Sequence, residues 1–288
     1  MTLAQLVQSS AARLRAAAVS YGHGTLNAHD EAAWLVLWRL GLPLDTELDE
    51  RAVLPEQQAQ AEALIAERIA SRKPAAYLTH EAWLQGVPFY VDERVIVPRS
   101  LIAELLADGT IDAWLSEQTR HVLDLCTGNG SLAVLAALAW PEVQVTGADL
   151  SPDALAVARI NVDRHGLQPR IALVQSDGLT QVPGPFDLIL CNPPYVCQAS
   201  MDTLPPEYRA EPELALAGGD DGMDFVRQLF RDAPVRMSEN AVLVLEIGNE
   251  AEHFLAAFAS LEVTWLPTSA GDDQVLLVTR EALLKFMA

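Results

Sequence analysis

Apolar side chains recur at every third or fourth position through the first quarter of the chain, which is the spacing of amphipathic helices. The pattern predicts helices that start near Leu3, after Asn27 and near Pro55. Each carries a single apolar stripe, so the three are expected to bury these stripes against one another. The sequence therefore predicts an N-terminal helical bundle over residues 1–74.

The pattern changes over residues 75–100, where aromatic and β-branched side chains alternate with polar ones. Gly86 and Asp92 stand at the positions expected for turns. These features predict a short β-hairpin that links the bundle to the rest of the chain. A helix is expected to follow from Leu101.

From Arg120 onward, apolar runs typical of strands alternate with helical patterns. Helices are predicted between the strands, one of them beginning at Ser151-Pro152 and another running from about Gly222 to Met237. The last two strands are joined too closely for a crossover, so they are expected to be antiparallel, while the others need parallel pairing. The predicted strands cover residues 121–125, 143–148, 170–174, 186–191, 241–247, 263–265 and 274–279.

This alternation predicts an α/β domain over residues 101–288, with a doubly wound, mostly parallel, seven-stranded sheet. Ligands bind such sheets at the carboxyl ends of the strands, where the chain order reverses. Polar residues or glycines follow four of the predicted strands, and they are Asp124 with Gly128 and Gly130, then Asp149, then Asp177, and finally Asn192. These four strand ends are the candidate binding site.

The fourth strand ends in Asn192-Pro193-Pro194-Tyr195. Two prolines remove two backbone donors, so the chain must leave the sheet in a rigid extended turn. The Asn192 side-chain oxygen and the Pro193 carbonyl could then hold a planar amino group, with the Tyr195 ring stacked on it. Such a clamp suits an enzyme that alkylates an amide or an exocyclic amine. The alternative is a proline-terminated loop with no chemical role.

The glycine turn and the acid about 20 residues further on also fit a dinucleotide-binding fingerprint, so a nicotinamide-dependent dehydrogenase is an alternative. Asp124 argues against it, because an acid just ahead of the glycines would repel a pyrophosphate. The same acid could hold the ammonium group of S-adenosylmethionine, and Asp149 could accept both ribose hydroxyls. Together with the clamp, these residues favour methyl transfer.

Composition narrows the choice of partner. The formal net charge is −20, with 19 Lys and Arg against 39 Asp and Glu, which disfavours a long nucleic-acid footprint. No signal peptide and no apolar run long enough to span a membrane is apparent. The three cysteines lack metal-type spacing, so we expect a cytoplasmic protein with free thiols and no metal site.

With these residues in view, nearly the whole chain resembles the class I S-adenosylmethionine-dependent methyltransferases that carry an Asn-Pro-Pro-Tyr motif and modify protein glutamines. One branch of that group acts on the Gly-Gly-Gln loop of release factors, the other on a glutamine of large-subunit ribosomal protein three. The segment Val91 to Ser100 and the cysteine at position 126 resemble the ribosomal-protein branch. The release-factor branch usually has a glycine in place of Cys126. Residues 201–212 resemble the segment that follows the clamp in the whole group.

The resemblance implies a role for each candidate residue. The clamp Asn192, Pro193, Pro194 and Tyr195 would orient the glutamine amide, and the cofactor would contact Asp124, Cys126, Thr127, Gly128, Gly130, Asp149, Leu150, Asp177 and Asn192. Arg99 would either reach the carboxylate of the cofactor or pair with a surface acid. The expected partner is large-subunit ribosomal protein three, free or within an assembling ribosomal particle, with the bundle recruiting it.

Three other functions compete with this interpretation. A release factor methyltransferase would share the chemistry and differ in its protein substrate. A DNA adenine or RNA guanine methyltransferase would need a basic groove that the charge does not supply. A non-catalytic binding module could keep the fold, although an intact clamp and intact acids weigh against it.

Overall fold

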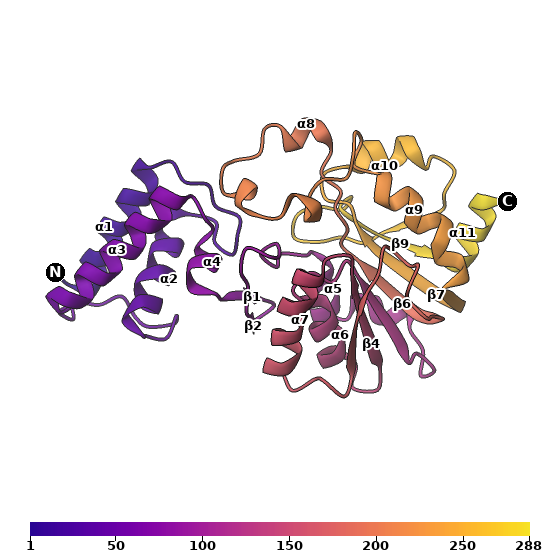
Figure 1. Cartoon of the computed structure of the whole chain (residues 1–288), viewed down its shortest axis with the longest axis horizontal. Coiled ribbons are helices and arrows are strands. Elements are labelled where there is room, and N and C mark those ends of the chain that lie inside the picture. Colours follow the sequence, from indigo (N-terminus) through magenta and orange to yellow (C-terminus); the bar gives the residue numbers. More distant parts are fainter.

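The computed structural model describes all 288 residues and shows a helical bundle beside an α/β domain (Figure 1). The bundle consists of α1 (Leu3–Ala16), α2 (Ala28–Leu40) and α3 (Pro55–Ser71). Side chains cap two of these helices: Thr2 and Gln5 form a capping box on α1, and the Asn27 side chain accepts from two backbone N–H groups of α2. The three predicted helices are therefore confirmed.

The linker contains a hairpin, but a shorter one than expected. It is formed by β1 (Ala82–Leu84) and β2 (Val87–Phe89), which pair antiparallel. Tyr77, read from the sequence as extended, lies instead in a short helix, α4 (Ala75–Thr79), where its buried ring joins the apolar core of the bundle. Residues 94–97 form no strand, although Val95 and Val97 are buried in the same core. Burial against the bundle replaces strand pairing here.

The sheet has seven strands in the order β5-β4-β3-β6-β7-β9-β8. The strands from β5 to β7 in this order pair in parallel. By contrast, β9 is antiparallel to both β7 and β8, as the short final connection predicts. The order reverses between β3 and β6. The strands are β3 (His121–Leu125), β4 (Gln144–Asp149), β5 (Ile171–Gln175), β6 (Phe186–Cys191), β7 (Met237–Glu246), β8 (Thr264–Trp265) and β9 (Val275–Thr279).

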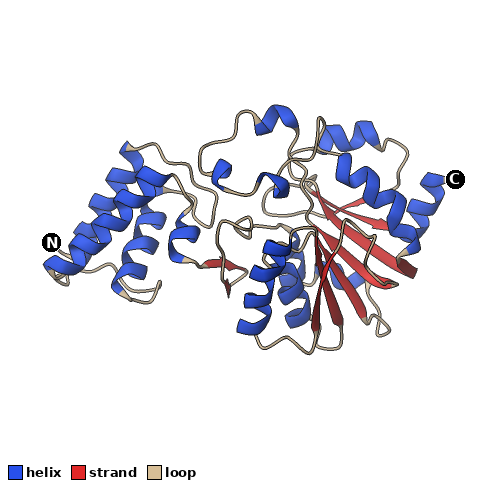
Figure 2. Ribbon diagram, in the orientation of Figure 1, coloured by secondary structure: helices blue, strands red, loops and turns tan.

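Helices cover both faces of the sheet (Figure 2). Alternate residues along β3 point to opposite sides, so that Val122 packs in one apolar cluster and Leu123 in another. One face is covered by α5 (Ile102–Ala107), α6 (Ser131–Ala139) and α7 (Pro152–Arg164), and the other by α9 (Asp224–Asp232), α10 (Ala251–Ala257) and α11 (Arg280–Met287). The 3₁₀ turns η1 (Thr110–Trp114) and η4 (Ala233–Val235) each add a buried residue to one of these clusters. A further short helix, α8 (Gln198–Met201), and the 3₁₀ turns η2 (Tyr208–Ala210) and η3 (Glu213–Ala215) lie in the loop that follows Tyr195.

Two boundaries near the C-terminus differ from expectation. The helix expected to reach Met237 ends at Asp232, because Pro234 cannot continue an α-helix and the chain turns through η4 into a longer β7. The helix α11 was not anticipated. The Thr279 side chain caps it by accepting from the backbone N–H of Ala282. No helix has both the length and the apolar character needed to cross a membrane.

Candidate functional site

The carboxyl ends of β3, β4, β5 and β6 meet around one cavity, at the reversal of strand order. Seven of the residues singled out from the sequence line it, and they are Cys126, Gly128, Asp149, Leu150, Asp177, Asn192 and Pro194. A narrower cavity adjoins it and shares Cys126, Gly128 and Asn192 with it, while adding Asp124 and Thr127. The structure thus gathers residues from four strand ends into one site, as parallel strands allow.

The turn after β3 owes its shape to three residues in the left-handed backbone region. Cys126 has a φ of 60°, Gly128 one of 55° and Gly130 one of 81°. Only glycine adopts this region freely, so Cys126 carries backbone strain of about 1–3 kcal/mol. Gly130 does not line either cavity. A Cβ placed there would lie 3.2 Å from the Cβ of Ala158, so this glycine lets α6 start close to α7.

Asp124 is almost completely buried, with 1% of its surface exposed. One carboxylate oxygen, Oδ2, accepts from the Thr127 hydroxyl and from the backbone N–H of Ala133 at 2.9 Å. Burial raises the pKa of Asp124 to about 7, although both hydrogen bonds oppose the rise. The second oxygen has no partner in the protein, so this carboxylate could accept from a cationic donor.

Asp149 ends β4 and fixes the loops on both sides of it. Its two carboxylate oxygens accept from the backbone N–H groups of Gly128 and Ser151, each at 2.9 Å. Burial raises the pKa of Asp149 above its ordinary value. Each oxygen keeps a second lone pair, so both can still accept from a pair of ligand hydroxyls. Asp177, by contrast, is exposed at the rim of the cavity.

The two oxygens that the predicted clamp needs as hydrogen-bond acceptors have no partner within the protein. The Asn192 side chain lines both cavities and makes no hydrogen bond with the rest of the protein. Pro193 is buried, and its carbonyl accepts no hydrogen bond either. Leaving the buried Pro193 carbonyl without a partner costs about 1–3 kcal/mol, whereas the half-buried Asn192 side chain opens to the two cavities. A ligand group with two N–H donors, one for each oxygen, would satisfy both acceptors.

Tyr195 lies outside the cavity of Asp149 and Asn192. It lines a separate cavity together with Tyr21 and Leu26 from the bundle, Tyr208 from the loop that follows the clamp, and Glu250. The clamp is therefore a wall between two cavities, with Asn192 and Pro194 facing one and Tyr195 facing the other. Sequence reasoning placed the Tyr195 ring at the clamp but could not give the side from which it approaches.

Of the two roles considered for Arg99 from the sequence alone, the structure bears on the pairing with an acid. Arg99 pairs with an acid, but with a buried one: its guanidinium donates to both carboxylate oxygens of Glu211 at 2.6 and 2.8 Å. Arg99 also lines the narrower cavity beside Asp124. Burial disfavours the charged Glu211 carboxylate, but Arg99 and His23 outweigh it and hold the pKa of Glu211 at about 2.

Sequence reasoning missed several residues of the cavity that Asp149 and Asn192 line. Ile96 comes from the linker, Pro212 and Leu214 from the loop after the clamp, and Phe225 from α9. They supply an apolar side to a cavity whose opposite side carries the acids. The one signal in the sequence was the resemblance of residues 201–212 to the segment that follows the clamp in the related enzymes, and that resemblance did not show that the loop returns to the cavity.

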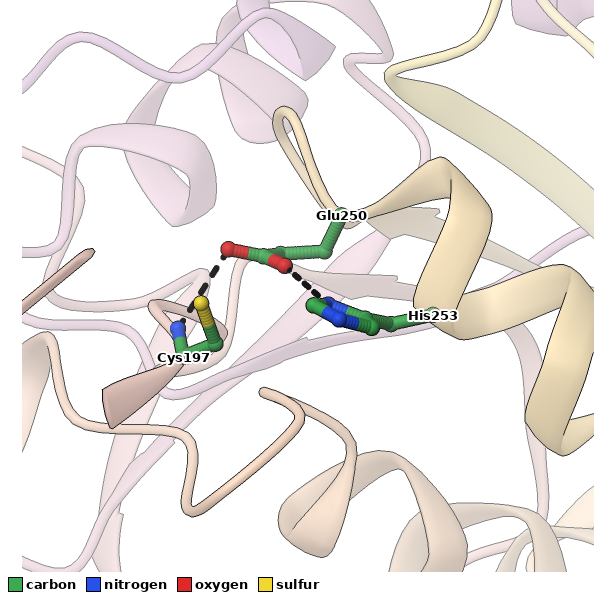
Figure 3. Close-up of side chains that lie close together, drawn as sticks. All are labelled: Cys197, Glu250 and His253. Carbon is green, nitrogen blue, oxygen red and sulfur yellow. Dashed lines mark hydrogen bonds and ion pairs between the residues drawn. The ribbon is translucent and has the colours of Figure 1, made fainter. Parts of the chain in front are cut away.

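A cluster of three potential metal ligands also escaped the sequence analysis. Cys197, Glu250 and His253 lie together at the start of α10, with their ligand atoms within 4.8 Å of one another (Figure 3). Glu250 accepts from the backbone N–H of Cys197 at 3.3 Å and lies 2.6 Å from the His253 ring nitrogen Nδ1. These contacts fasten the loop after the clamp to α10 and account for the cluster without an ion.

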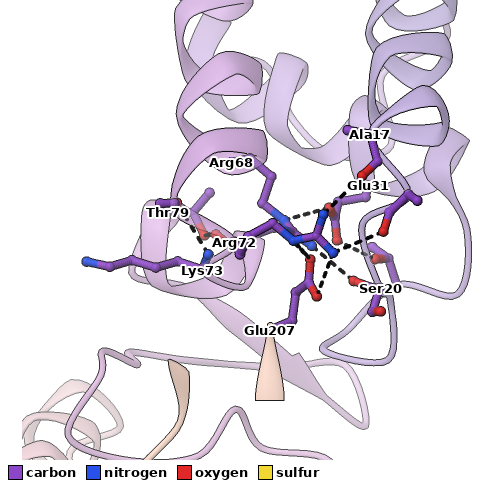
Figure 4. A network of polar contacts seen from close by, with 12 residues as sticks. Ala17, Ser20, Glu31, Arg68, Arg72, Lys73, Thr79 and Glu207 are labelled. Atoms are coloured by element: carbon purple, nitrogen blue, oxygen red, sulfur yellow. Dashed lines mark hydrogen bonds and ion pairs between the residues drawn. The ribbon is translucent and has the colours of Figure 1, made fainter. Parts of the chain in front are cut away.

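The same loop is fastened to the bundle by a buried ionic network (Figure 4). Glu207 and Arg68 are fully buried, and the Arg68 guanidinium donates to Glu207 at 3.1 Å and to Glu31 at 2.9 Å. Arg72 adds a second cation beside Glu207, and the carbonyl of Ser20 accepts from Arg68. Four bundle residues and one loop residue therefore form one connected network between the two parts of the molecule.

The sequence matches one family model over part of its length and several named proteins over nearly all of it. The sequence model of the methyltransferase small domain family matches residues 104–204. A Bordetella pertussis protein is 54% identical over 98% of this chain and 96% of its own length, and a Burkholderia pseudomallei protein is 51% identical over 96% and 94%. A Neisseria meningitidis protein is 46% identical over 98% and 94%. Each of the three is named ribosomal protein uL3 glutamine methyltransferase.

The fold is likewise shared with solved structures. The hMettl16 catalytic domain, solved in complex with a MAT2A 3′UTR hairpin, superposes with a TM-score of 0.52 over 81% of this chain and 85% of its own. The two sequences are 13% identical, so this likeness extends to the fold alone. It confirms the predicted class I methyltransferase architecture.

Proposed function

Because the chain belongs to the ribosomal protein uL3 glutamine methyltransferases, we propose that it transfers a methyl group from S-adenosylmethionine to the side-chain amide nitrogen of a glutamine in uL3, which is large-subunit ribosomal protein three. The observation that carries this proposal is the pair of unpaired acceptors at the clamp, the Asn192 side chain and the Pro193 carbonyl. Two fixed acceptors match the two N–H donors of a primary amide. The substrate is uL3 either as the free protein or within an assembling ribosomal particle.

The residues present fit S-adenosylmethionine. The cofactor supplies an activated methyl group on a positively charged sulfur, and it also carries an ammonium group and two ribose hydroxyls. Asp124 keeps one oxygen without a partner beside the narrower cavity, suited to the ammonium group, and Asp149 keeps a lone pair on each oxygen for the hydroxyls. Cys126, Thr127, Gly128 and Leu150 would hold the cofactor between them, and Asp177 would meet the adenine at the rim.

The chemistry asked of the clamp is orientation. An amide nitrogen is a poor nucleophile, because its lone pair is delocalised into the carbonyl. Hydrogen bonds from the –NH2 group to Asn192 and Pro193 would aim the nitrogen and accept the positive charge that develops on it. Because both acceptors sit on a chain stiffened by two prolines, they need little reorganisation during the reaction. The methylated amide then loses its extra proton to water.

The cavity on the far side of the clamp is the proposed path of the substrate. It lies between the bundle and the loop after the clamp, and Tyr195 forms part of its wall. No Lys or Arg lines it, while Glu250 does. The net charge of −20 would attract a basic ribosomal protein toward this surface. In this arrangement the bundle contributes to substrate recognition through Tyr21 and Leu26.

Transfer of labelled methyl from S-adenosylmethionine to purified uL3 and to a purified release factor tests the function. Mass spectrometry then locates the label. We expect label on one glutamine of uL3 and none on the release factor. Label on the Gly-Gly-Gln loop alone would assign the chain to the sister activity, and label on neither protein would contradict glutamine methylation altogether.

Replacing Asn192 by Ala tests the clamp. The variant loses one of the two acceptors, so kcat is expected to fall by about 10²–10³-fold, as when one preorganised hydrogen-bonding group is removed from an active site. The dissociation constant of S-adenosylmethionine, measured by calorimetry, should change little. A parallel loss of turnover and cofactor affinity would show that Asn192 holds the cofactor and not the amide.

Leu26 offers a test of the substrate path, because 87% of its surface is exposed and it lines the cavity. Leu26→Ala is expected to raise the KM for uL3 several-fold, because about 1–2 kcal/mol of apolar contact is lost. Leu54→Ala is the matched control, since Leu54 is 64% exposed on the bundle but lies outside the cavity. Equal KM values in the two variants would exclude the bundle side of this cavity as the path.

A further inference from the structure

Tyr195 is held from several sides, although the loop in which it lies has little regular structure. Its hydroxyl donates to Oε1 of Glu246 at 3.3 Å, a long hydrogen bond. Gly248 lies against its ring, and a Cβ placed at Gly248 would be 2.5 Å from the ring carbon Cε2. The backbone of Tyr195 leaves no room for a side chain at two further glycines. A Cβ placed at Gly218 would lie 2.8 Å from the carbonyl carbon of Tyr195, and one at Gly222 would lie closer still to its carbonyl oxygen. Three glycines and one acid therefore enclose this residue.

Glu246 is a buried acid at the last position of β7, with 3% of its surface exposed. It lines neither the cavity of Asp149 and Asn192 nor the cavity that Tyr195 lines. Its second oxygen, Oε2, accepts from the Ser100 hydroxyl at 2.6 Å and from the backbone N–H of Leu101 at 2.9 Å. No Lys or Arg pairs with it. A buried carboxylate without a cation is costly, so its position calls for a function.

We propose that Glu246 is a positioning residue for methyl transfer, which acts by holding the Tyr195 ring at the wall between the two cavities. The inference rests on the proposed function, because it gives Tyr195 a contact with the substrate amide. Ser100 and Leu101 fix the carboxylate, the carboxylate fixes the hydroxyl, and Gly248 leaves space for the ring in that one orientation. A fixed ring could pack on the amide plane without first losing side-chain entropy.

Steady-state methyl transfer to uL3 by full-length variants tests this chain of contacts. Tyr195→Phe removes the donor of the hydroxyl–carboxylate contact. Glu246→Gln leaves a single oxygen, which Ser100 and Leu101 both bind, so the Tyr195 hydroxyl faces an –NH2 group and loses its acceptor. Each substitution is expected to lower kcat about tenfold, the upper range for one hydrogen bond. The KM for S-adenosylmethionine should stay unchanged. The double variant should be no slower than either single one, because both changes break the same contact. If the fold-loss of kcat in the double variant equalled the product of the two single fold-losses, the two side chains would act independently and the proposal would be overturned.

Ser238→Ala is the matched control, since it removes a hydroxyl of the same strand, β7, that donates to a different acid, Asp187, and lines neither cavity. It should lower the unfolding midpoint and leave kcat unchanged; a loss of kcat equal to that of Glu246→Gln would show that the loss reflects a weakened fold alone. Should Glu246→Gln fail to fold, Gly248→Ala displaces the same ring from its other side. It is then expected to lower kcat in the wild-type background, and normal turnover would contradict the proposal.

Ring dynamics separate this inference from the proposed function. In protein with ¹³C-labelled tyrosine, the Tyr195 signals are assigned by their loss in Tyr195→Phe. The two edges of the ring should give distinct signals in the wild type and averaged ones in Glu246→Gln. Unchanged ring dynamics would overturn the positioning role whatever the activity. A released ring combined with no transfer to uL3 by the wild type would instead refute the substrate assignment and leave Tyr195 positioned for another one.

Discussion

Two groups of acids that are largely withdrawn from solvent differ in their counter-charges. Asp124 and Asp149 lie at the carboxyl ends of β3 and β4, where their carboxylates accept from backbone N–H groups and, for Asp124, from the Thr127 hydroxyl. No arginine or lysine neutralises them, and burial raises the pKa of both. Glu207 and Glu211 lie between the loop after the clamp and the bundle, each paired with an arginine.

The arginines reverse the direction of the pKa shift. Burial alone would raise the pKa of Glu207, yet its own backbone N–H and Arg68 lower it overall. The same holds for Glu211 with Arg99. An arginine beside Glu207 or Glu211 compensates the charge of that acid within the protein. Asp124 and Asp149 have no such partner and keep acceptor sites that the ammonium and hydroxyl groups of a ligand could use. We therefore assign Glu207 and Glu211 to structure, and we propose a binding role for Asp124 and Asp149.

The largest expected effect follows from breaking the paired group. Arg68→Met removes the cation that both Glu31 and Glu207 contact and leaves their buried carboxylates with less compensation. The free energy of unfolding, measured with urea, should fall by about 3–5 kcal/mol. Arg51→Met is the control, because Arg51 pairs with Asp49 on the surface and should cost about 1 kcal/mol or less. Similar losses in the two variants would remove the distinction between the interface and an ordinary surface.

The positions of Asp124 and Asp149 could be predicted from the sequence because each stands at the end of a strand. Local patterns set the strands and the glycine turn, and parallel pairing then brings their ends together whatever the intervening helices are. Asp124, Asp149 and Asn192 were found in this way. The short C-terminal helix and the end of α9 were misjudged, although Pro234 and the capping Thr279 marked both in the sequence.

The paired acids could not be predicted in this way, because their partners are distant in sequence. Arg68 and Glu207 are separated by 139 residues, and Arg99 and Glu211 by 112. No periodicity connects an acid in an irregular loop to a helix of another domain. The same reason explains why Glu246 was missed, 51 residues beyond the tyrosine that it contacts. Resemblance to related enzymes marked the loop as important, but the contacts of its acids depend on tertiary packing.

The two groups should also respond to pH in opposite directions. The pKa of Glu211 is about 2 in the folded chain against an ordinary 4.5, so its contribution to stability is present above pH 4.5 and lost as the pH falls toward 2. This contribution amounts to at most about 3 kcal/mol. The pKa of Asp124 is raised to about 7 from an ordinary 3.8, so its contribution is present below pH 3.8 and lost as the pH rises through 7.

Urea unfolding between pH 3 and pH 8 separates these contributions in two variants. Glu211→Gln should flatten the acid limb of the stability profile below pH 4.5, while its neutral limb stays like that of the wild type. Asp124→Asn should flatten the decline toward pH 7 and leave the acid limb unchanged. If either substitution altered both limbs equally, the acids would not titrate independently, and the division into two groups would fail.

Asp149→Ala is expected to have the smallest effect on the free energy of unfolding and a large effect on the affinity for S-adenosylmethionine. Asp149→Ala removes both proposed acceptors for the ribose, so the dissociation constant of S-adenosylmethionine should rise about 10–100-fold, equivalent to about 1.5–3 kcal/mol for hydrogen bonds to a charged group. Stability should change little, because loss of the backbone contacts to Gly128 and Ser151 is offset by removal of a half-buried charge that no cation pairs. Asp177→Ala should weaken binding less, since Asp177 is exposed at the rim. Calorimetry and urea unfolding of the same samples measure both quantities, and a variant that lost stability while retaining affinity would place Asp149 with Glu207 among the structural acids.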